Sequence, residues 1–526
     1  MSSIVGVYSK DGENVLQYIV RMIQKTLHRG PNFLGIDLNH NVCRVQSIEE
    51  LFDCGLEGSF GVGVASRNSG QPFQHRELDI SLICDGEIYN QSQIEELTNK
   101  QFAVDKESIL HIFEKFLLTK LDISFAMNQT LKSLDGVYSF ALFYKNLFLI
   151  ARDPIGVKPL YLSENDGKIA FASERKALWN IGMFETYPLP PSSWAIIGES
   201  GIKINYIQRF KEEYDKKSSL ETMQQKLLKL LTKSLEKRIK RGKVGVLFSG
   251  GLDSVVLAKI IQKLGYEPTL YCSGVEGSKD VRGAMQGAEK LGLPLKVNFM
   301  TLENLQENLP NIVYMVEETN PSKLSIALPI FFSTQQAKSD GLEFIISGNG
   351  ADELFGGYSR YIQTLKRGGY TALHQTLLED IREMAEKNIQ RDEAASMANS
   401  VELKLPYLDY ELVKYVLSIP PQYKIVEINS SYVRKFILKK VAEKIELPEN
   451  LVNRPKIAMQ FGSLSQKLLE KLAKNNGFTK NLAQKYRYQS PLKLFIETIA
   501  RLKEIPGTNP ELETLIPKIK NEKQQA

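Results

Sequence analysis

Cysteine and histidine are scarce in this chain of 526 residues, and neither is clustered. The four cysteines, Cys43, Cys54, Cys84 and Cys272, form no CxxC pair, and no group of histidines stands beside them. Disulfide frameworks and zinc sites depend on such groupings, so we expect neither. A reducing compartment follows from that expectation, and the cytoplasm is the predicted location.

Two further absences narrow the class of protein. The N-terminus lacks the basic flank and apolar core of a signal peptide, and no apolar run approaches the ~20 residues that span a bilayer. The net charge of +6 is small for this length, and the lysines and arginines are spread widely. We therefore expect neither a membrane nor a nucleic acid as a partner, because a nucleic-acid binder usually concentrates its basic residues on one face.

The pattern of expected strands and helices divides the chain into two domains, residues 1–210 and 211–526, with the boundary near 206–218. Short strands dominate the first domain, whereas the second alternates strand and helix and becomes largely helical beyond residue 400. Such alternation predicts a parallel sheet covered by helices. The local expectations are helices near 13–28 and 105–119, a hairpin turning at Lys145-Asn146, a loop from 188, a helix from Ser219, and a late helix from Ser490 with Pro491 in its first turn.

The stretch VGVLFSGGLDS (244–254) carries the strongest chemical signal. An apolar strand, Val244–Phe248, is expected to end in the turn Ser249-Gly250-Gly251, and a helix to start near Asp253 and Ser254. Two glycines let the backbone approach a phosphate, and a helix N-terminus directs N–H groups toward an anion. Ser249 and Ser254 add hydroxyl donors, and Asp253 suits a Mg²⁺ ligand.

The alternative for this stretch is a glycine-rich loop that merely ends an αβ unit. The stretch 244–254 is not a Walker loop, because the pattern GxxxxGK[ST] is absent. The motif resembles the PP-loop of the ATP pyrophosphatases, which cleave ATP to AMP and pyrophosphate while adenylating an acceptor.

Further motifs extend the resemblance over nearly the whole chain. They are HRGPN (28–32), DGEIYN (85–90), ARDPIGVKPLYL (151–162), FASERKAL (171–178), SGNGADELFGGYSRY (347–361), RDEAASMANSVELKLPYLD (391–409) and RPKIAMQFGS (454–463). In this order they resemble asparagine synthetases of the glutamine-dependent type. That resemblance implies an N-terminal Ntn-hydrolase-type αββα sandwich. It also implies a C-terminal α/β, Rossmann-like PP-loop domain with a helical end, which adenylates the side-chain carboxylate of aspartate.

The resemblance also implies roles for residues of the second domain. Asp253 and Asp352 match the family's Mg²⁺–pyrophosphate ligands, and Lys456 matches the lysine that stabilises charge on the leaving pyrophosphate. The ATP-binding set is then Ser249, Gly250, Gly251, Asp253, Ser254, Ser347 and Gly348, and the cofactors are ATP and Mg²⁺.

Two positions depart from the family pattern. Asn349 stands where asparagine synthetases usually have Glu and where β-lactam synthetases have Tyr. Asparagine cannot take up a proton near neutral pH, so either another base deprotonates the incoming ammonia or the acceptor chemistry differs. Lys404 replaces an arginine of the family. The sequence around GADE (350–353) also resembles that of the asparagine-synthetase-domain proteins.

The N-terminal site departs more strongly, because the family's nucleophilic cysteine is Ser2 here. A hydroxyl is a far weaker nucleophile than a thiol. The family's glutamine-binding Asn-Gly-Glu is Asp85-Gly86-Glu87, whereas Asp105 matches the carboxylate that takes the α-ammonium of glutamine. The pocket arginine has no clear counterpart, and Arg67 is the nearest candidate. We interpret Ser2 as the remnant of a nucleophile, with a working serine glutaminase as the alternative.

The sequence therefore predicts an ATP-dependent, AMP-forming amide ligase that makes asparagine, with Lys456 and Asn349 in its catalytic centre and a weak or lost glutaminase. Three alternatives stay open: a related ligase with another acid or amine, as in β-lactam synthetases; an interaction protein that kept the fold; and, more distantly, a PP-loop tRNA modifier. The predicted partners are small-molecule substrates (ATP, aspartate or a similar acid, and ammonia or glutamine), and a homodimer is left open.

Overall fold

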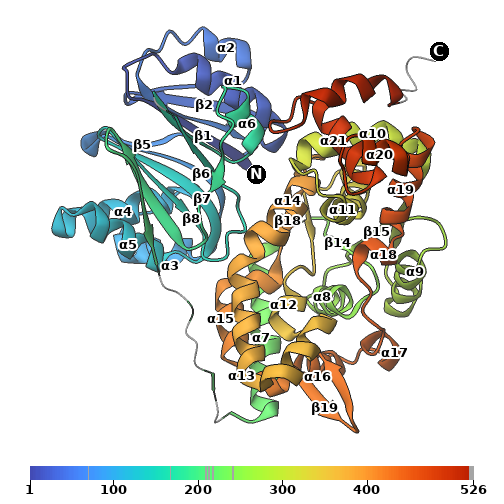
Figure 1. Ribbon diagram of the computed structural model, residues 1–526. Helices are drawn as coiled ribbons and strands as arrows, with labels where there is room; N and C mark the ends of the chain where they lie inside the picture. Colours follow the sequence, from blue (N-terminus) through green and yellow to red (C-terminus); the bar gives the residue numbers. More distant parts are fainter. Residues whose placement is uncertain are drawn as a thin grey trace. The chain divides into compact units, whose positions relative to one another are not determined.

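The structure is a computed structural model that describes residues 1–68, 70–165, 167–207, 210, 214–215, 218–239 and 242–519 (Figure 1). The chain divides into two compact units, residues 1–209 and 210–526. Much of the boundary expected near 206–218 consists of residues 208–209, 211–213 and 216–217, which lie outside the described ones. Among the described residues, no helix has the length and apolarity needed to cross a membrane.

The first unit contains two antiparallel sheets. One has the strand order β11-β9-β10-β1-β4-β2-β3, and the other has the order β13-β12-β8-β7-β6-β5. A core of alternating apolar residues from both sheets, among them Val64 and Phe143, lies between them. The strands are β1 (Ser2–Ser9), β2 (Phe33–Leu38), β3 (Asn41–Val45), β4 (Phe60–Ser66), β5 (Phe73–His75), β6 (Ile80–Ile88), β7 (Gly136–Tyr144), β8 (Leu147–Arg152), β9 (Tyr161–Glu164), β10 (Lys168–Ala172), β11 (Tyr187–Pro188), β12 (Ser193–Gly198) and β13 (Gly201–Tyr206).

Helices cover the outer faces of both sheets, which makes the expected αββα sandwich. The apolar sides of α1 and α6 pack on the seven-stranded sheet, and those of α4 and α5 pack on the six-stranded one. The predicted helices near 13–28 and 105–119 are α1 and α4, and the predicted hairpin is the β7–β8 turn at Lys145. The helices are α1 (Leu16–Thr26), α2 (Ile48–Phe52), α3 (Gln91–Thr98), α4 (Glu107–Lys120), α5 (Ile123–Ser133) and α6 (Arg175–Trp179).

The expectation of only two helices in this unit is wrong. The additional helices have 5 to 11 residues, and the three shortest, α2, α3 and α6, have too few turns to give a clear apolar period. Capping contributes to two of them: Asp122 accepts a hydrogen bond from the N–H of Phe125 at the start of α5, and Ser47 does the same for Glu50 at α2.

The expectation of no disulfide is also wrong. Cys43 on β3 and Cys54 after α2 are bonded, with their Cα atoms 6.4 Å apart. Their spacing of 11 residues carries no recognisable pattern; they meet because α2 folds back against β3. Cys84 and Cys272 are free and buried.

The second unit is built on a five-stranded parallel sheet with the order β16-β15-β14-β17-β18. The chain moves outward from β14 to β16 and then returns to the other side of β14, so the strand order reverses between β14 and β17. In such sheets the crevice outside the carboxyl ends of these two strands is the usual ligand site. The strands are β14 (Gly245–Leu247), β15 (Thr269–Gly274), β16 (Leu295–Phe299), β17 (Phe344–Ile346) and β18 (Glu402–Lys404), and a separate hairpin pairs β19 (Ile425–Ile428) with β20 (Ser431–Arg434).

Helices surround this sheet and form the end of the chain, as expected (Figure 1). Ser219 and Ser490 are the N-caps of α7 and α21, each accepting a backbone hydrogen bond three residues on. The helices are α7 (Leu220–Arg238), α8 (Leu252–Lys263), α9 (Lys279–Leu291), α10 (Leu302–Val316), α11 (Pro321–Ser339), α12 (Ala351–Phe355), α13 (Ser359–Met384), α14 (Gln390–Met397), α15 (Tyr410–Ser418), α16 (Phe436–Lys444), α17 (Glu449–Val452), α18 (Met459–Gly462), α19 (Ser465–Asn475), α20 (Lys480–Lys485) and α21 (Pro491–Leu502).

Candidate functional site

The turn between β14 and α8 has the geometry of an anion-binding loop. Gly250 has φ +69°, and a Cβ atom there would lie 2.1 Å from the carbonyl oxygen of Gly283, so the position requires glycine. Gly251 is the N-cap of α8, and no side chain caps the helix there. The backbone N–H groups at the N-terminus of α8, and the positive end of its dipole, are therefore suited to bind a phosphate.

A second turn, after β17, lies beside the first. It runs from Ser347 to Asp352, and its Gly350 has φ +92°. Because β14 and β17 are parallel neighbours, both turns leave the same edge of the sheet. This edge brings Asp253 and Asp352, which are 99 residues apart in sequence, to one place.

One lysine joins the two aspartates, and a second lysine is paired with one of them. The Lys435 Nζ atom is 2.6 Å from Asp253 Oδ2 and 2.6 Å from Asp352 Oδ1. The Lys456 Nζ atom is 2.7 Å from Asp352 Oδ2. Lys435 is buried, whereas the Lys456 side chain is 37% exposed.

The cluster shifts the pKa values of its members in opposite directions. Burial alone would raise the pKa of Asp352, but the ammonium groups of Lys435 and Lys456 outweigh burial and hold that pKa below its usual range. Burial raises the pKa of Asp253 more than Lys435 lowers it, and the charge of Asp352 adds to the rise. The two carboxylates thus share the ammonium group of Lys435, and Asp352 has that of Lys456 in addition.

These groups lie on the wall of one cavity of about 550 Å³. Of the second-unit residues predicted for the ATP and catalytic sites, only Gly250 is not on its wall; the predicted Ser2 lies in the first unit. Burial raises the pKa of two further carboxyl groups there, to about 6 for Asp280 and about 7 for Glu353. The predicted residues on the wall are Ser249, Gly251, Asp253, Ser254, Ser347, Gly348, Asn349, Asp352 and Lys456.

The side chain of Asn349 is hydrogen-bonded at both ends of its amide. Its Oδ1 atom accepts a hydrogen bond from Ser347 Oγ at 2.7 Å, and its Nδ2 atom donates to Asp392 Oδ2 at 2.5 Å. Arg391 Nε donates to the other oxygen of Asp392 at 2.7 Å. The asparagine is thus hydrogen-bonded to a carboxylate that also lines the cavity.

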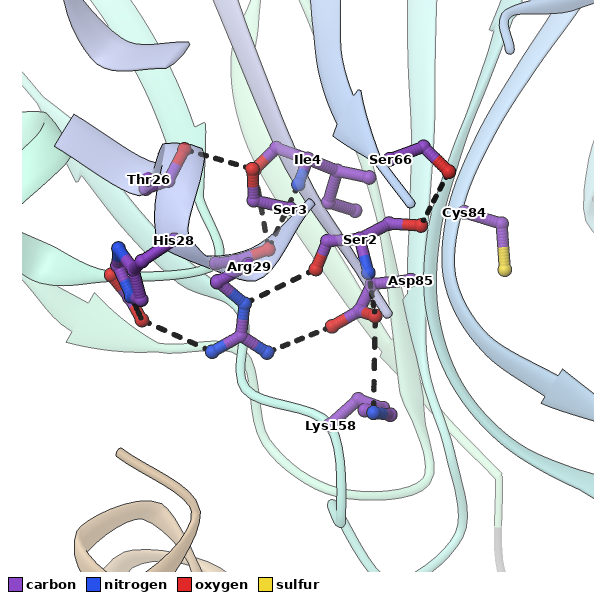
Figure 2. A network of polar contacts seen from close by, with 12 residues as sticks. Ser2, Ser3, Ile4, Thr26, His28, Arg29, Ser66, Cys84, Asp85 and Lys158 are labelled. Atoms are coloured by element: carbon purple, nitrogen blue, oxygen red, sulfur yellow. Dashed lines mark hydrogen bonds and ion pairs between the residues drawn. The ribbon is translucent and has the colours of Figure 1, made fainter. Parts of the chain in front are cut away.

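The predicted residues at the N-terminus also meet, in the first unit. Ser2 lies on β1, fully buried, and its Oγ atom contacts Ser66 Oγ at 3.2 Å and Lys106 Nζ at 3.1 Å. The Ser2 N–H donates to Asp85 Oδ1 at 3.0 Å. Figure 2 shows Ser2 and Asp85 side by side, with Arg29 in contact with both. The Nε atom of Arg29 donates a hydrogen bond to the Ser2 carbonyl, and its Nη2 atom donates to Asp85 Oδ2.

A buried ion network surrounds Ser2. Burial would raise the pKa of Asp85, but Lys158 and Arg29 hold it below its usual range. Burial would likewise raise the pKa of Glu174, but His28 and Lys176, followed by Arg29, hold it well below. The network includes Asp85, one of the residues predicted to bind glutamine.

The remaining residues predicted for this pocket lie in the same unit. Asp105 Oδ2 accepts a hydrogen bond from the N–H of Ile88 at 2.8 Å. Gly86 has φ +147°, and a Cβ atom there would lie 2.1 Å from the carbonyl of Val137. Glu87 is half-buried, and Arg67 is buried with its backbone N–H bonded to the carbonyl of Met1.

Several residues of both sites escaped the sequence interpretation. Lys435 and Asp392 were missed although Asp392 lies within a quoted motif, because a lone lysine or aspartate has no distinctive neighbours. Lys106 was missed although it follows Asp105 directly. Arg29, Lys158 and Glu174 also stand in quoted motifs, and their types already hinted at a charge network.

The fold and the two turns define a protein with an Ntn-type sandwich and a PP-loop-type nucleotide-binding unit. Residues 226–371 and 364–488 match the model of the asparagine synthase family, and residues 59–180 match that of the glutamine amidotransferase domain. The chain is 33% identical to "Putative asparagine synthetase [glutamine-hydrolyzing] 1" of Methanocaldococcus jannaschii, over 91% of this chain and 97% of that protein.

Plant proteins show the same relationship at lower identity. The chain is 26% identical to "Asparagine synthetase [glutamine-hydrolyzing] 1" of Lotus japonicus, over 83% of this chain and 73% of that protein. It is 27% identical to "Asparagine synthetase [glutamine-hydrolyzing]" of Sandersonia aurantiaca, over 85% of this chain and 84% of that protein. The chain belongs to the asparagine synthetase family, a family of ATP-using carbon–nitrogen ligases.

Proposed function

We propose that this protein makes asparagine from aspartate, ATP and ammonia and releases AMP and pyrophosphate. The carboxylate of aspartate would attack the α-phosphate of ATP to form a β-aspartyl-adenylate, and ammonia would then displace AMP. The observation that carries the proposal is the cluster of Asp253, Asp352, Lys435 and Lys456 at the strand-order reversal of the parallel sheet.

The donor set of this cluster fits Mg²⁺. Two carboxylates with phosphate oxygens and water are the usual surroundings of this ion, which keeps several of its waters. Asp253 and Asp352 would hold it, and its charge would neutralise the triphosphate. Lys456, being partly exposed, supplies a mobile positive charge for the leaving pyrophosphate.

We further propose that the first unit has lost efficient glutamine hydrolysis. The hydroxyl of Ser2 is fully buried and already bonded to Ser66 and Lys106. If Met1 is removed, the new α-amino group would lie beside the carboxylate of Asp85, which favours the ammonium form and so disfavours a role as a base. Ammonia would therefore come from solution.

The domain assignment and location complete the proposal. Residues 1–210 form the glutamine-amidotransferase-like domain, and residues 211–526 form the synthetase domain. We propose a cytoplasmic location because ATP and aspartate are cytoplasmic metabolites; the Cys43–Cys54 bond removes the argument from cysteine usage.

The test is product analysis with purified protein, ATP, Mg²⁺, aspartate and an ammonium salt. We expect AMP, pyrophosphate and asparagine in equal amounts, and loss of all three in Asp253→Asn and Asp352→Asn. Lys456→Ala should lose turnover while keeping most ATP binding, because its charge is needed mainly as pyrophosphate leaves. The matched control is Lys263→Ala, which removes an exposed lysine paired with Glu446 on the same unit.

Two results would contradict the proposal. AMP formation at the normal rate in both aspartate variants would exclude the cluster as the ATP site. Formation of AMP with a different acid from a panel of amino acids, but not with aspartate, would exclude asparagine as the product.

A further inference from the structure

The second half of the proposed reaction requires a proton acceptor. When ammonia attacks the adenylate carbonyl, the new C–N bond leaves a positively charged nitrogen, and one proton must depart before the amide is stable. Asn349 faces the cavity but cannot take up a proton. Another group must therefore accept this proton, and its assignment rests on the proposed function.

We propose that Asp392 binds the attacking ammonia and accepts its proton. Nitrogen forms a bond to the acyl carbon, the proton moves to a carboxylate oxygen of Asp392, and the bond from the acyl carbon to the phosphate oxygen breaks. AMP leaves with that electron pair, and Asp392 then releases the proton to water.

The contacts of Asp392 support this role. It lies on the cavity wall with only 3% of its surface exposed, and its two oxygens accept hydrogen bonds from Asn349 and Arg391. Each oxygen keeps a further lone pair for a ligand. A carboxylate this buried is costly unless its charge is paired, and Arg391 pairs it while holding it in place.

Asn349 takes a positioning role beside it. Its amide nitrogen is held by Asp392 and its amide oxygen by Ser347 Oγ, so the orientation of the side chain is fixed. Ser347 belongs to the turn after β17, which we assign to ATP. The pair therefore lies next to the place where the acyl-adenylate would form.

The other carboxylates of the cavity have different engagements. Asp253 and Asp352 are paired with Lys435 and Lys456. Asp280 packs against Gly462, where a Cβ atom would lie 2.3 Å from its Oδ1. Glu353 Oε1 accepts hydrogen bonds from Tyr358 and Asn388, each at 2.8 Å, and makes Glu353 the competing candidate.

The experiment separates the two half-reactions. Aspartate-dependent exchange of pyrophosphate into ATP reports the adenylate, and asparagine formation from ammonium reports the amide step. We expect Asp392→Asn to keep the exchange rate and to lose asparagine formation by about 10²- to 10⁴-fold, the usual contribution of a general base. The double variant N349E/D392N should recover much of the loss, because it returns a carboxylate to the cavity wall.

The control is Asp380→Asn, which changes a buried carboxylate of α13 that is bonded to Arg360 and Tyr361 outside the cavity. It should leave both rates unchanged. Normal asparagine formation by Asp392→Asn, loss of exchange and amide formation together, or loss confined to Glu353→Gln would each overturn the inference. Absence of exchange in the unmodified protein would instead overturn the proposed function.

Discussion

At Ser2, the neighbouring side chains determine what a single residue can do. A glutaminase needs a nucleophile, a base and donors for the oxyanion. Here the hydroxyl is engaged by Lys106, and the backbone N–H points at a carboxylate, Asp85. A negative charge at position 85 would oppose a developing oxyanion, whereas an asparagine there would donate to it.

This comparison gives a prediction at the residue scale. Ser2→Cys should release little glutamate from glutamine, because a thiol alone does not restore an oxyanion donor worth ~3 kcal/mol, about two orders of magnitude in rate. The double variant S2C/D85N should exceed the sum of the single variants. Glutamate release is the measurement. Efficient release by the unmodified protein that vanishes in Ser2→Ala would show that the serine is an active nucleophile.

At the scale of elements, the approach of α9 to the turn before α8 shapes the nucleotide site. Gly250 lies against the carbonyl of Gly283 on α9, and the guanidinium of Arg454 fills the space beside both glycines. Arg454 also donates a hydrogen bond to the carbonyl of Ser249. The turn is thus held by contacts from two other segments of the chain.

We predict that Gly250→Ala lowers the free energy of unfolding by about 1–3 kcal/mol and abolishes AMP formation, because the turn must open to admit a Cβ atom. The control is Gly265→Ala at the other end of α8. It also has a positive φ, +87°, but no atom lies within 4 Å of the added Cβ. Urea unfolding and AMP release check both. Equal loss of activity in the two variants would show that backbone strain alone, rather than the contact with Gly283, is responsible.

At the scale of the whole molecule, both units should gain stability as the pH rises, but each in a different pH window. The second unit buries Lys424 completely, and among the described residues its Nζ atom has no hydrogen-bond partner. Burial lowers its pKa to about 7, well below the value of about 10.4 expected in the unfolded chain. The unfolded state therefore binds more protons between these values, and stability should rise with pH across that window.

Lys424→Met tests this linkage. At pH 7 the variant should be more stable than the unmodified protein by about 1–4 kcal/mol, as when buried charges are replaced by apolar groups of similar volume. The difference should shrink as the pH approaches 10. Urea unfolding at several pH values, followed by circular dichroism, measures it. A destabilised variant at pH 7 would mean that the ammonium is stabilised by its surroundings.

The first unit should lose stability in acid. The pKa of Glu174 is depressed in the folded state, so its contribution is present above about 4.5, the ordinary value, and is lost as the pH falls toward the depressed one. Glu174→Gln should destabilise the unit by about 3–5 kcal/mol at pH 7, because it leaves Arg29 and Lys176 without their shared carboxylate, and should flatten the acid slope. An unchanged slope would assign the acid sensitivity to other carboxyl groups.

The sequence determined much of this protein because its signals are local. A glycine-rich turn between an apolar strand and a helix, the N-caps Ser219 and Ser490, and the alternation of strand and helix each follow from neighbouring residues. The order of the motifs identified the family. The Cys43–Cys54 bond was not predicted, because it depends on how α2 folds back against β3.

Only the tertiary structure decided which charges face one another. It placed Lys435 between Asp253 and Asp352, Lys106 beside Ser2, and Asp392 beside Asn349. Each pair is separated by 43 or more residues along the chain, so no spacing reveals it. An ion pair acts over a few ångströms, and that distance is set by the packing of whole elements rather than by the sequence next to either residue.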